Sequence, residues 1–204
     1  MIVYAITDRR SLKDDLLGTV ERQLHAGVDY LQIREKDLTD RDLFELTGAV
    51  LSLPNPTNTK ILVNGRVDIA VAAGAAGVHL SSSSPGTRKI CRSMPAGLIA
   101  AVSTHSLEEA MVAEKDGADL AVFGPVFATP SKVSFGSPQG LEVLGVVCQS
   151  VSMPVLALGG VTVHNAVACV DRGAAGVAAI SLFQGQTDLN QLVGELHKVQ
   201  SGPS

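Results

Sequence analysis

A glycine-centred phrase recurs four times along this 204-residue chain and limits its fold more than any other feature. Each copy is typical of a helix that stops at a glycine, which accepts a positive φ, and is followed directly by a short apolar strand. Repeated helix-to-strand junctions predict an α/β fold. The copies are Ala26-Gly-Val-Asp-Tyr-Leu31, Ala73-Gly-Ala-Ala-Gly-Val78, Asp116-Gly-Ala-Asp-Leu-Ala121 and Arg172-Gly-Ala-Ala-Gly-Val177.

Four more strand-like runs alternate with these phrases: Ile2 to Ile6, Lys60 to Asn64, Leu98 to Ser103 and Val155 to Leu158. Together they predict eight strands near residues 2, 29, 60, 77, 98, 119, 155 and 176, separated by segments with helical periodicity. A spacing of roughly 25 residues per unit is typical of a compact (β/α)8 TIM barrel. We predict one such domain over residues 1–204, with the last few residues disordered.

The alternative fold is an open doubly wound sheet, which also alternates strands and helices. It usually has fewer strands and often carries a glycine fingerprint after the first one. Here the first strand runs into Thr7-Asp-Arg-Arg10, so the sequence favours the barrel.

Composition excludes several classes of function. A net charge of -4 without a block of lysines and arginines argues against nucleic acid or an acidic membrane as a partner. No run of about eighteen apolar residues and no basic leader occur, so we expect a cytoplasmic protein without a membrane span. Cys91, Cys148 and Cys169 lack disulfide or zinc spacing and are expected to be small buried side chains.

The second strand ends in polar residues at alternate positions: Gln32, Arg34 and Lys36. Side chains two apart on a strand share a face, and an unpaired charge is costly inside a sheet. Two cations on one face therefore predict a bound anion. In the alternative interpretation, both cations are solvated and pair with Glu35 or Asp37.

Other strand ends carry further polar residues, and in a barrel these ends form the active site. Asn64 either lines the site or makes a turn, and the serine run 81–84 is a hydroxyl donor set or only a loop. Ser103 and His105 share a face after the fifth strand, although a single histidine is more often structural.

The last three strand ends suggest phosphate binding. Thr129, Ser131 and Lys132 bring two hydroxyls and an ammonium into one long connection, whose alternative role is a solvated surface loop. Gly159-Gly160 and Ser181 follow the seventh and eighth strands, where barrels often hold a phosphate on backbone amides and a short helix.

With these residues assembled, the chain resembles the thiamine-phosphate synthase and thiazole tautomerase (TenI-like) superfamily over nearly its whole length. The resemblance implies a (β/α)8 barrel that binds a thiazole phosphate. In the synthase, an aminopyrimidine methyl pyrophosphate is ionised and captured by the thiazole nitrogen. The matching segments are Gln32-Ile-Arg-Glu-Lys36, Val63-Asn64, Gly77-Val-His-Leu80, Val102-Ser103, Gly124-Pro-Val-Phe-Ala-Thr129-Pro-Ser-Lys132, Leu158-Gly-Gly160 and Ile180-Ser181.

The resemblance also implies roles for individual residues. Those that would hold the thiazole phosphate are Thr129, Ser131, Gly159, Gly160, Ile180 and Ser181. Those around the pyrophosphate are Gln32, Arg34, Lys36, Asn64, Ser103 and Lys132. Lys36 and Lys132, as charges, and His105, as a proton carrier, are the predicted catalytic residues.

The chain departs from both branches of the superfamily. The synthase resemblance implies two magnesium-binding aspartates, and this chain has Gly65 and Ser84 at those positions, so no metal ligand is predicted although the synthase uses Mg²⁺. The tautomerase resemblance implies a histidine where Pro125 stands. A proton carrier in that branch would be His105 or His79.

Four functions stay open at this point. The first is a thiamine-phosphate synthase-like transferase, and the second is a thiazole tautomerase-like isomerase. The third is a non-catalytic regulator that binds thiazole phosphate or thiamine phosphate. The fourth is another phosphosugar barrel, for which Asp8 is the evident acid. The predicted partners are small-molecule substrates, with homo-oligomer formation left open.

Overall fold

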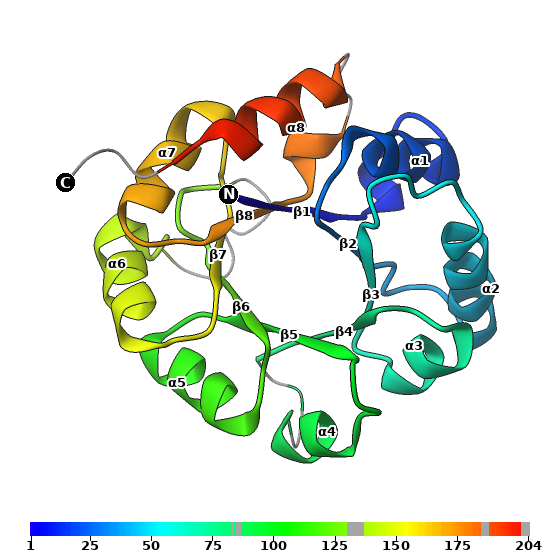
Figure 1. Cartoon of the computed structure of the whole chain (residues 1–204), viewed down its shortest axis with the longest axis horizontal. Coiled ribbons are helices and arrows are strands. Elements are labelled where there is room, and N and C mark those ends of the chain that lie inside the picture. Colours follow the sequence, from blue (N-terminus) through cyan, green and yellow to red (C-terminus); the bar gives the residue numbers. More distant parts are fainter. Residues whose placement is uncertain (83, 85–86, 130–136, 185–187, 201–204) are drawn as a thin grey trace.

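The computed structural model describes residues 1–82, 84, 87–129, 137–184 and 188–200. Its eight parallel strands form one closed barrel in chain order, and helices surround the barrel (Figure 1). The strands are β1 (Ile2–Ile6), β2 (Tyr30–Ile33), β3 (Lys60–Asn64), β4 (Gly77–Leu80), β5 (Ile99–Thr104), β6 (Leu120–Phe123), β7 (Val155–Leu158) and β8 (Gly176–Ala179).

Eight α-helices alternate with the strands over the described residues. They are α1 (Leu16–Ala26), α2 (Asp40–Leu51), α3 (Val67–Ala73), α4 (Thr87–Ser93), α5 (Leu107–Asp116), α6 (Gly140–Ser150), α7 (Val163–Asp171) and α8 (Leu189–Lys198). Two short 3₁₀ helices, η1 (Arg9–Ser11) and η3 (Ser181–Phe183), follow β1 and β8. The predicted TIM barrel is confirmed, and the open sheet is wrong because β1 pairs with β8.

The predicted glycine stops explain how the chain turns from helix to strand. Helices α1, α3 and α5 end at Gly27, Gly74 and Gly117, each in the left-handed region. Gly173 follows α7 with a φ of 92°. The last few residues were predicted to be disordered, and residues 201–204 lie outside the described part of the chain.

The hydrophobic core has two layers. The larger one packs the outward faces of the strands against the helices, and the smaller one fills the barrel with side chains such as Tyr4, Leu62, Val122 and Leu156. Toward the C-terminal ends of β2 to β5 the inward positions become polar. We call this end of the barrel the mouth.

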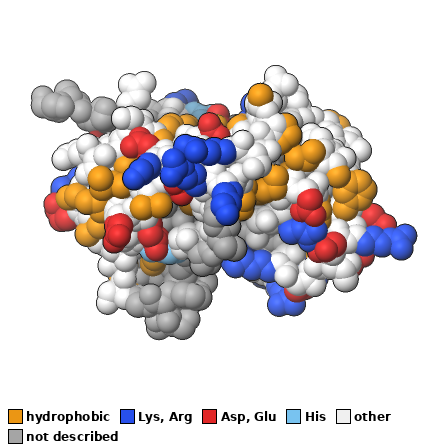
Figure 2. All heavy atoms as spheres, turned by 90° about the horizontal axis from the view of Figure 1, so that it is seen from below, with side chains coloured by type: hydrophobic (Ala, Val, Ile, Leu, Met, Phe, Trp, Pro, Cys, Tyr) orange, Lys and Arg blue, Asp and Glu red, His pale blue; other side chains and the backbone are white. Residues whose placement is uncertain are grey.

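Three features of the whole molecule bear on the sequence-based expectations: the burial of the cysteines, the character of the helices and the distribution of surface charge. Cys169 is buried, but Cys91 and Cys148 are only half-buried, so the expectation of three buried cysteines was wrong for two. Among the described residues, no helix has the length and apolar character needed to cross a membrane. The face in Figure 2 carries basic and acidic side chains near one another, interspersed with apolar ones.

Candidate active site

Polar side chains from neighbouring strands meet inside the mouth. Gln32, only 2% exposed, donates from Nε2 to Oδ1 of Asn64 at 2.9 Å. Gln32 lies on β2 and Asn64 ends β3, its strand neighbour. Asn64 therefore faces the barrel rather than serving only as a turn residue.

A second hydrogen-bonded group crosses the barrel from β1 to β5. His79 on β4 is 3% exposed, with Nδ1 2.7 Å from the Tyr4 hydroxyl and Nε2 2.8 Å from Ser103 Oγ. Burial, and secondarily the charge of Arg34, lower the pKa of His79 to about 3. Burial also raises the pKa of Tyr4 well above its usual value. The imidazole is therefore neutral near pH 7.

Arg34 and Lys36 lie close enough to repel one another. The pKa of Lys36 is lowered first by the charge of Arg34 and then by desolvation. Neither has a carboxylate partner in the described part of the chain. Glu35 and Asp37 instead pair with Arg9 and Arg10, so the interpretation of Arg34 and Lys36 as partners of these acids was wrong.

Glu35 and Asp37 link the loop after β2 to the loop after β1. Glu35 is 4% exposed and accepts from Thr7 Oγ1 at 2.6 Å and from the Arg9 backbone N–H at 3.1 Å. The Arg34 backbone N–H donates to Thr7 Oγ1 at 2.9 Å. Side chains at 35 and 37 thus turn toward β1. Arg34 and Lys36 follow the end of β2 at Ile33. Arg34 is half-buried and its charge acts on His79, whereas Lys36 is exposed in a turn.

The opposite side of the mouth is formed after β7 and β8. Gly160 has a φ of 64°, and a Cβ there would lie 2.6 Å from the Ala128 carbonyl oxygen. The glycine pair 159–160 thus lets this turn press against the connection after β6. Ser181 begins η3 immediately after Ile180, as expected for a phosphate-binding short helix.

The position of η3 is fixed by the β1 connection. Gln184 accepts from Ser11 Oγ at 2.8 Å and donates to the Asp8 carbonyl at 3.3 Å. Thr129 is half-buried in the connection after β6, whereas Ser131 and Lys132 lie outside the described residues. Their predicted roles stay predictions.

His105 and Ser84 have local hydrogen-bond partners, whereas Gly65 faces open space. His105 Nδ1 contacts the Gly124 carbonyl, and its backbone N–H donates to Glu109 at 2.6 Å. Ser84 Oγ accepts from the Ser81 backbone N–H at 3.0 Å. Gly65 has a φ of 69°, and a Cβ built there would meet no atom within 4 Å.

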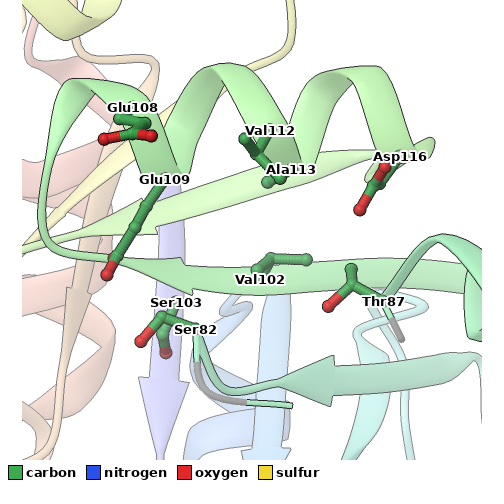
Figure 3. Close-up of a pocket in the computed structure, with 9 residues that line it drawn as sticks. All are labelled: Ser82, Thr87, Val102, Ser103, Glu108, Glu109, Val112, Ala113 and Asp116. Atoms are coloured by element: carbon green, nitrogen blue, oxygen red, sulfur yellow. The ribbon is translucent and has the colours of Figure 1, made fainter. Parts of the chain in front are cut away.

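A pocket of about 190 Å³ opens beside Ser103, between the connection after β4 and α5 (Figure 3). Glu108, Glu109 and Asp116 give it an acidic edge, and Val112 lies between them on α5. Its other lining residues are Ser82, Thr87, Val102 and Ala113.

Four residues that shape the site were not predicted from the sequence: Tyr4, Thr7, Arg9 and Glu35. Tyr4 had a readable signal, because it alternates with Ile2 and Ile6 and so shares their inward face. Nothing local could identify the partners of Glu35. They lie 26 and 28 residues earlier in the sequence.

The buried histidine makes a testable prediction about stability. An unfolded histidine protonates near pH 6.5, whereas His79 protonates near pH 3. Between these values the unfolded chain binds more protons, so the free energy of unfolding should fall by about 1 kcal/mol per pH unit as the pH drops. Urea unfolding at pH 7.0, 6.0 and 5.0 measures the slope. His79→Gln is the control. An equal slope in both proteins would show that protonation of His79 is not the cause of the pH dependence.

Comparison with known proteins places the chain in a family. The thiamine monophosphate synthase (TMP-TENI) family profile matches residues 3–183. The chain belongs to this family. The thiamine-phosphate synthase of Roseiflexus castenholzii is 39% identical over 188 residues, which is 92% of this chain and 82% of that protein. That of Roseiflexus sp. strain RS-1 is 37% identical over 199 residues, covering 97% and 84%.

A solved structure agrees with both sequence relatives. The thiamine phosphate pyrophosphorylase of Pyrococcus furiosus superposes with a TM-score of 0.85 and 35% identity, over 97% of this chain and 94% of that one. The predicted family is confirmed, as is the predicted enzyme class, a thiamine-phosphate synthase-like transferase. Membership argues against the other phosphosugar barrels.

Proposed function

We propose that the protein joins a thiazole phosphate to an aminopyrimidine methyl pyrophosphate to give thiamine phosphate. The observation that carries this proposal is the pair Arg34 and Lys36, two cations without a carboxylate partner in the described chain. They follow β2 at the same end of the barrel as the glycine turn 159–160 after β7 and η3 after β8. Two places for anionic groups in one mouth match a reaction whose two substrates both carry phosphate.

The reaction requires stabilisation of the negative charge that develops on the leaving pyrophosphate. The bond between the methylene carbon and the pyrophosphate oxygen breaks, and its electron pair leaves with the pyrophosphate. The thiazole nitrogen then forms the new bond to that carbon with its lone pair. Arg34 and Lys36 stabilise the charge that develops on the leaving group, together with Lys132. No proton is transferred to or from carbon, so this reaction needs no catalytic role for His105.

The uncharged polar residues suit the organic part of the pyrophosphate substrate. Gln32, Asn64 and Ser103 lie on β2, β3 and β5, facing the barrel. A ring with nitrogen acceptors and an amino group can bond with such amides and hydroxyls. Because these residues are held by neighbours on adjacent strands, they lose little freedom when a ligand binds.

The synthase family uses Mg²⁺. The positions that the resemblance assigns to its two aspartates hold Gly65 and Ser84 in this chain, and neither supplies a carboxylate. Gly65 has no side chain, and the Ser84 hydroxyl is bonded within its own turn. Within residues 1–82, 84, 87–129, 137–184 and 188–200, no group of three His, Cys, Asp or Glu side chains could hold a metal ion. The proposed reaction therefore has no step through a metal held by these side chains.

The proposal is tested with purified protein and both substrates, with and without Mg²⁺. We expect thiamine phosphate and pyrophosphate to form in equal amounts. No product at high enzyme concentration in either condition would reject the proposal. Product that needs no Mg²⁺ would support catalysis by side-chain cations alone.

Carboxylates introduced at positions 65 and 84 should raise the dependence of turnover on Mg²⁺. In Gly65→Asp/Ser84→Asp, the new side chain at 65 enters open space, and aspartate tolerates a positive φ better than most residues. We expect at least about tenfold faster turnover with saturating Mg²⁺, because a metal neutralises the leaving group. The matched control is Gly65→Asn/Ser84→Asn. Equal activity of the two double variants would contradict this expectation.

A non-catalytic binder is the second candidate, favoured by the same residues, Gly65 and Ser84. It would bind thiazole phosphate or thiamine phosphate in calorimetry without turnover. The tautomerase alternative has less support, because Pro125 is buried at the position of the implied histidine, and because the low pKa of His79 leaves the imidazole unprotonated near pH 7 and weakly basic.

A further inference from the structure

We infer that Tyr4 and His79 are positioning residues that fix the direction of the hydrogen bond made by Ser103. Through this relay, the Ser103 hydroxyl donates its proton into the mouth. The position therefore offers a proton to a ligand atom with a lone pair. The direction of the bond stands on the structure alone, whereas the identity of the ligand rests on the proposed function.

The relay starts at Tyr4, whose ring lies inside the barrel with 0% exposure. In the described structure, the only hydrogen-bond partner of its hydroxyl is His79 Nδ1, 2.7 Å from the hydroxyl oxygen. A buried hydroxyl proton without an acceptor is costly. The phenol also stays protonated, because burial raises its pKa. Tyr4 is therefore the donor, and His79 Nδ1 is the acceptor.

The direction at Tyr4 determines the tautomer of His79. A neutral imidazole carries one N–H, and here Nδ1 accepts, so the proton is on Nε2. Nε2 lies 2.8 Å from Ser103 Oγ and donates to it. The second proton that would let both nitrogens donate is disfavoured, since burial and Arg34 lower the pKa of His79 to about 3.

At Ser103 the relay reaches the mouth. Its oxygen accepts from His79, and in the described chain no other hydrogen bond of this hydroxyl occurs. Ser103 is half-buried near the end of β5, and Figure 3 shows it beside Ser82 at the edge of the pocket. Its proton is available to a ligand. On the proposed substrates, the acceptors for this proton are ring nitrogens and phosphate oxygens.

The tautomer can be measured without any substrate. In ¹⁵N-labelled protein, NMR should show a protonated Nε2 and an unprotonated Nδ1 for His79, unchanged between pH 5 and pH 8. The His79→Gln variant assigns the signals by their loss. A proton on Nδ1, or a doubly protonated ring, would overturn the inference.

Kinetics then test whether the relay acts through Ser103. We expect Tyr4→Phe to lower kcat/KM by about tenfold, the effect of one lost hydrogen bond. The control is Tyr30→Phe, because Tyr30 contacts the Tyr4 ring but its hydroxyl is in no hydrogen bond described for this chain. In a Ser103→Ala background, Tyr4→Phe should have no further effect.

A full tenfold loss in that background, or an equal loss in Tyr30→Phe, would overturn the inference. An aminopyrimidine substrate with C–H in place of a ring nitrogen separates the two acceptors. If Ser103 binds that nitrogen, the analogue should be about as poor with wild-type protein as the true substrate is with Ser103→Ala. If the wild-type protein shows no turnover, the proposed function is rejected. The inference about the His79 tautomer is not affected, because NMR tests it without substrate.

Discussion

Arg34→Met is expected to lower kcat/KM of the proposed synthase reaction by about 100-fold to 1,000-fold, the range for removing one preorganised charge-stabilising group. Methionine keeps much of the apolar stem and removes only the charged head. Steady-state kinetics with the pyrophosphate substrate measure the loss. Stability should change little, because the described structure gives Arg34 no ion pair to lose.

A matched arginine provides the control. Arg41 lies on α2, and its side chain is 86% exposed in an ion pair with Glu45. Arg41→Met should leave kcat/KM within about twofold of wild type, since exposed ion pairs contribute little. In Arg34→Met the pKa of Lys36 should also rise, because the charge of Arg34 is the main cause of its lowering. An Arg34→Met loss below about threefold would contradict an anion site here.

The second large effect is expected at Gly160. In Gly160→Ala, the added Cβ would lie 2.6 Å from the Ala128 carbonyl oxygen and 2.8 Å from Phe127 Cβ. The residue would also keep a φ of 64°, which disfavours alanine. We expect about 2–4 kcal/mol lower stability from overpacking and backbone strain together. The KM for thiazole phosphate should rise, because the turn must move.

Gly194→Ala is the control for the general effect of replacing a glycine by alanine. Gly194 lies inside α8, and a Cβ there would meet no atom within 4 Å. Alanine in place of a glycine inside a helix should stabilise the protein by up to about 1 kcal/mol. Urea unfolding of both variants measures the difference. Equal midpoints for the two proteins would show that the turn after β7 tolerates a side chain.

Much of the fold could be predicted because its signals are local. A glycine that ends a helix and an apolar run that forms a strand are each contained within a few residues, so β1, β3 and β7 have the predicted bounds. β5 is shifted by one residue, to Ile99–Thr104, because the apolar pattern does not mark where pairing with β4 and β6 starts.

The site was less predictable, because only part of it follows from period-two alternation. Alternation placed Gln32 and Arg34 on one face, and the strand ends identified Asn64 and Ser103. The pairing of Glu35 with Arg9 was not predictable, because the contact depends on β1 and β2 lying side by side. Sequence neighbours had suggested Arg34 or Lys36 as its partner.

Closure of the barrel couples ligand binding to the completion of folding. β1 pairs with both β2 and β8, and its connection contacts the residues around Arg34 on one side and η3 on the other. A partly folded chain without β8 in place would have the residues after β2 but would not hold η3 against the loop after β1. A ligand that contacts both the residues after β2 and η3 therefore binds only the closed barrel. Its binding free energy stabilises the fully folded protein and not the partly folded chain. Saturation with such a ligand should make unfolding more cooperative, which links the chemistry of the mouth to the last strand pairing.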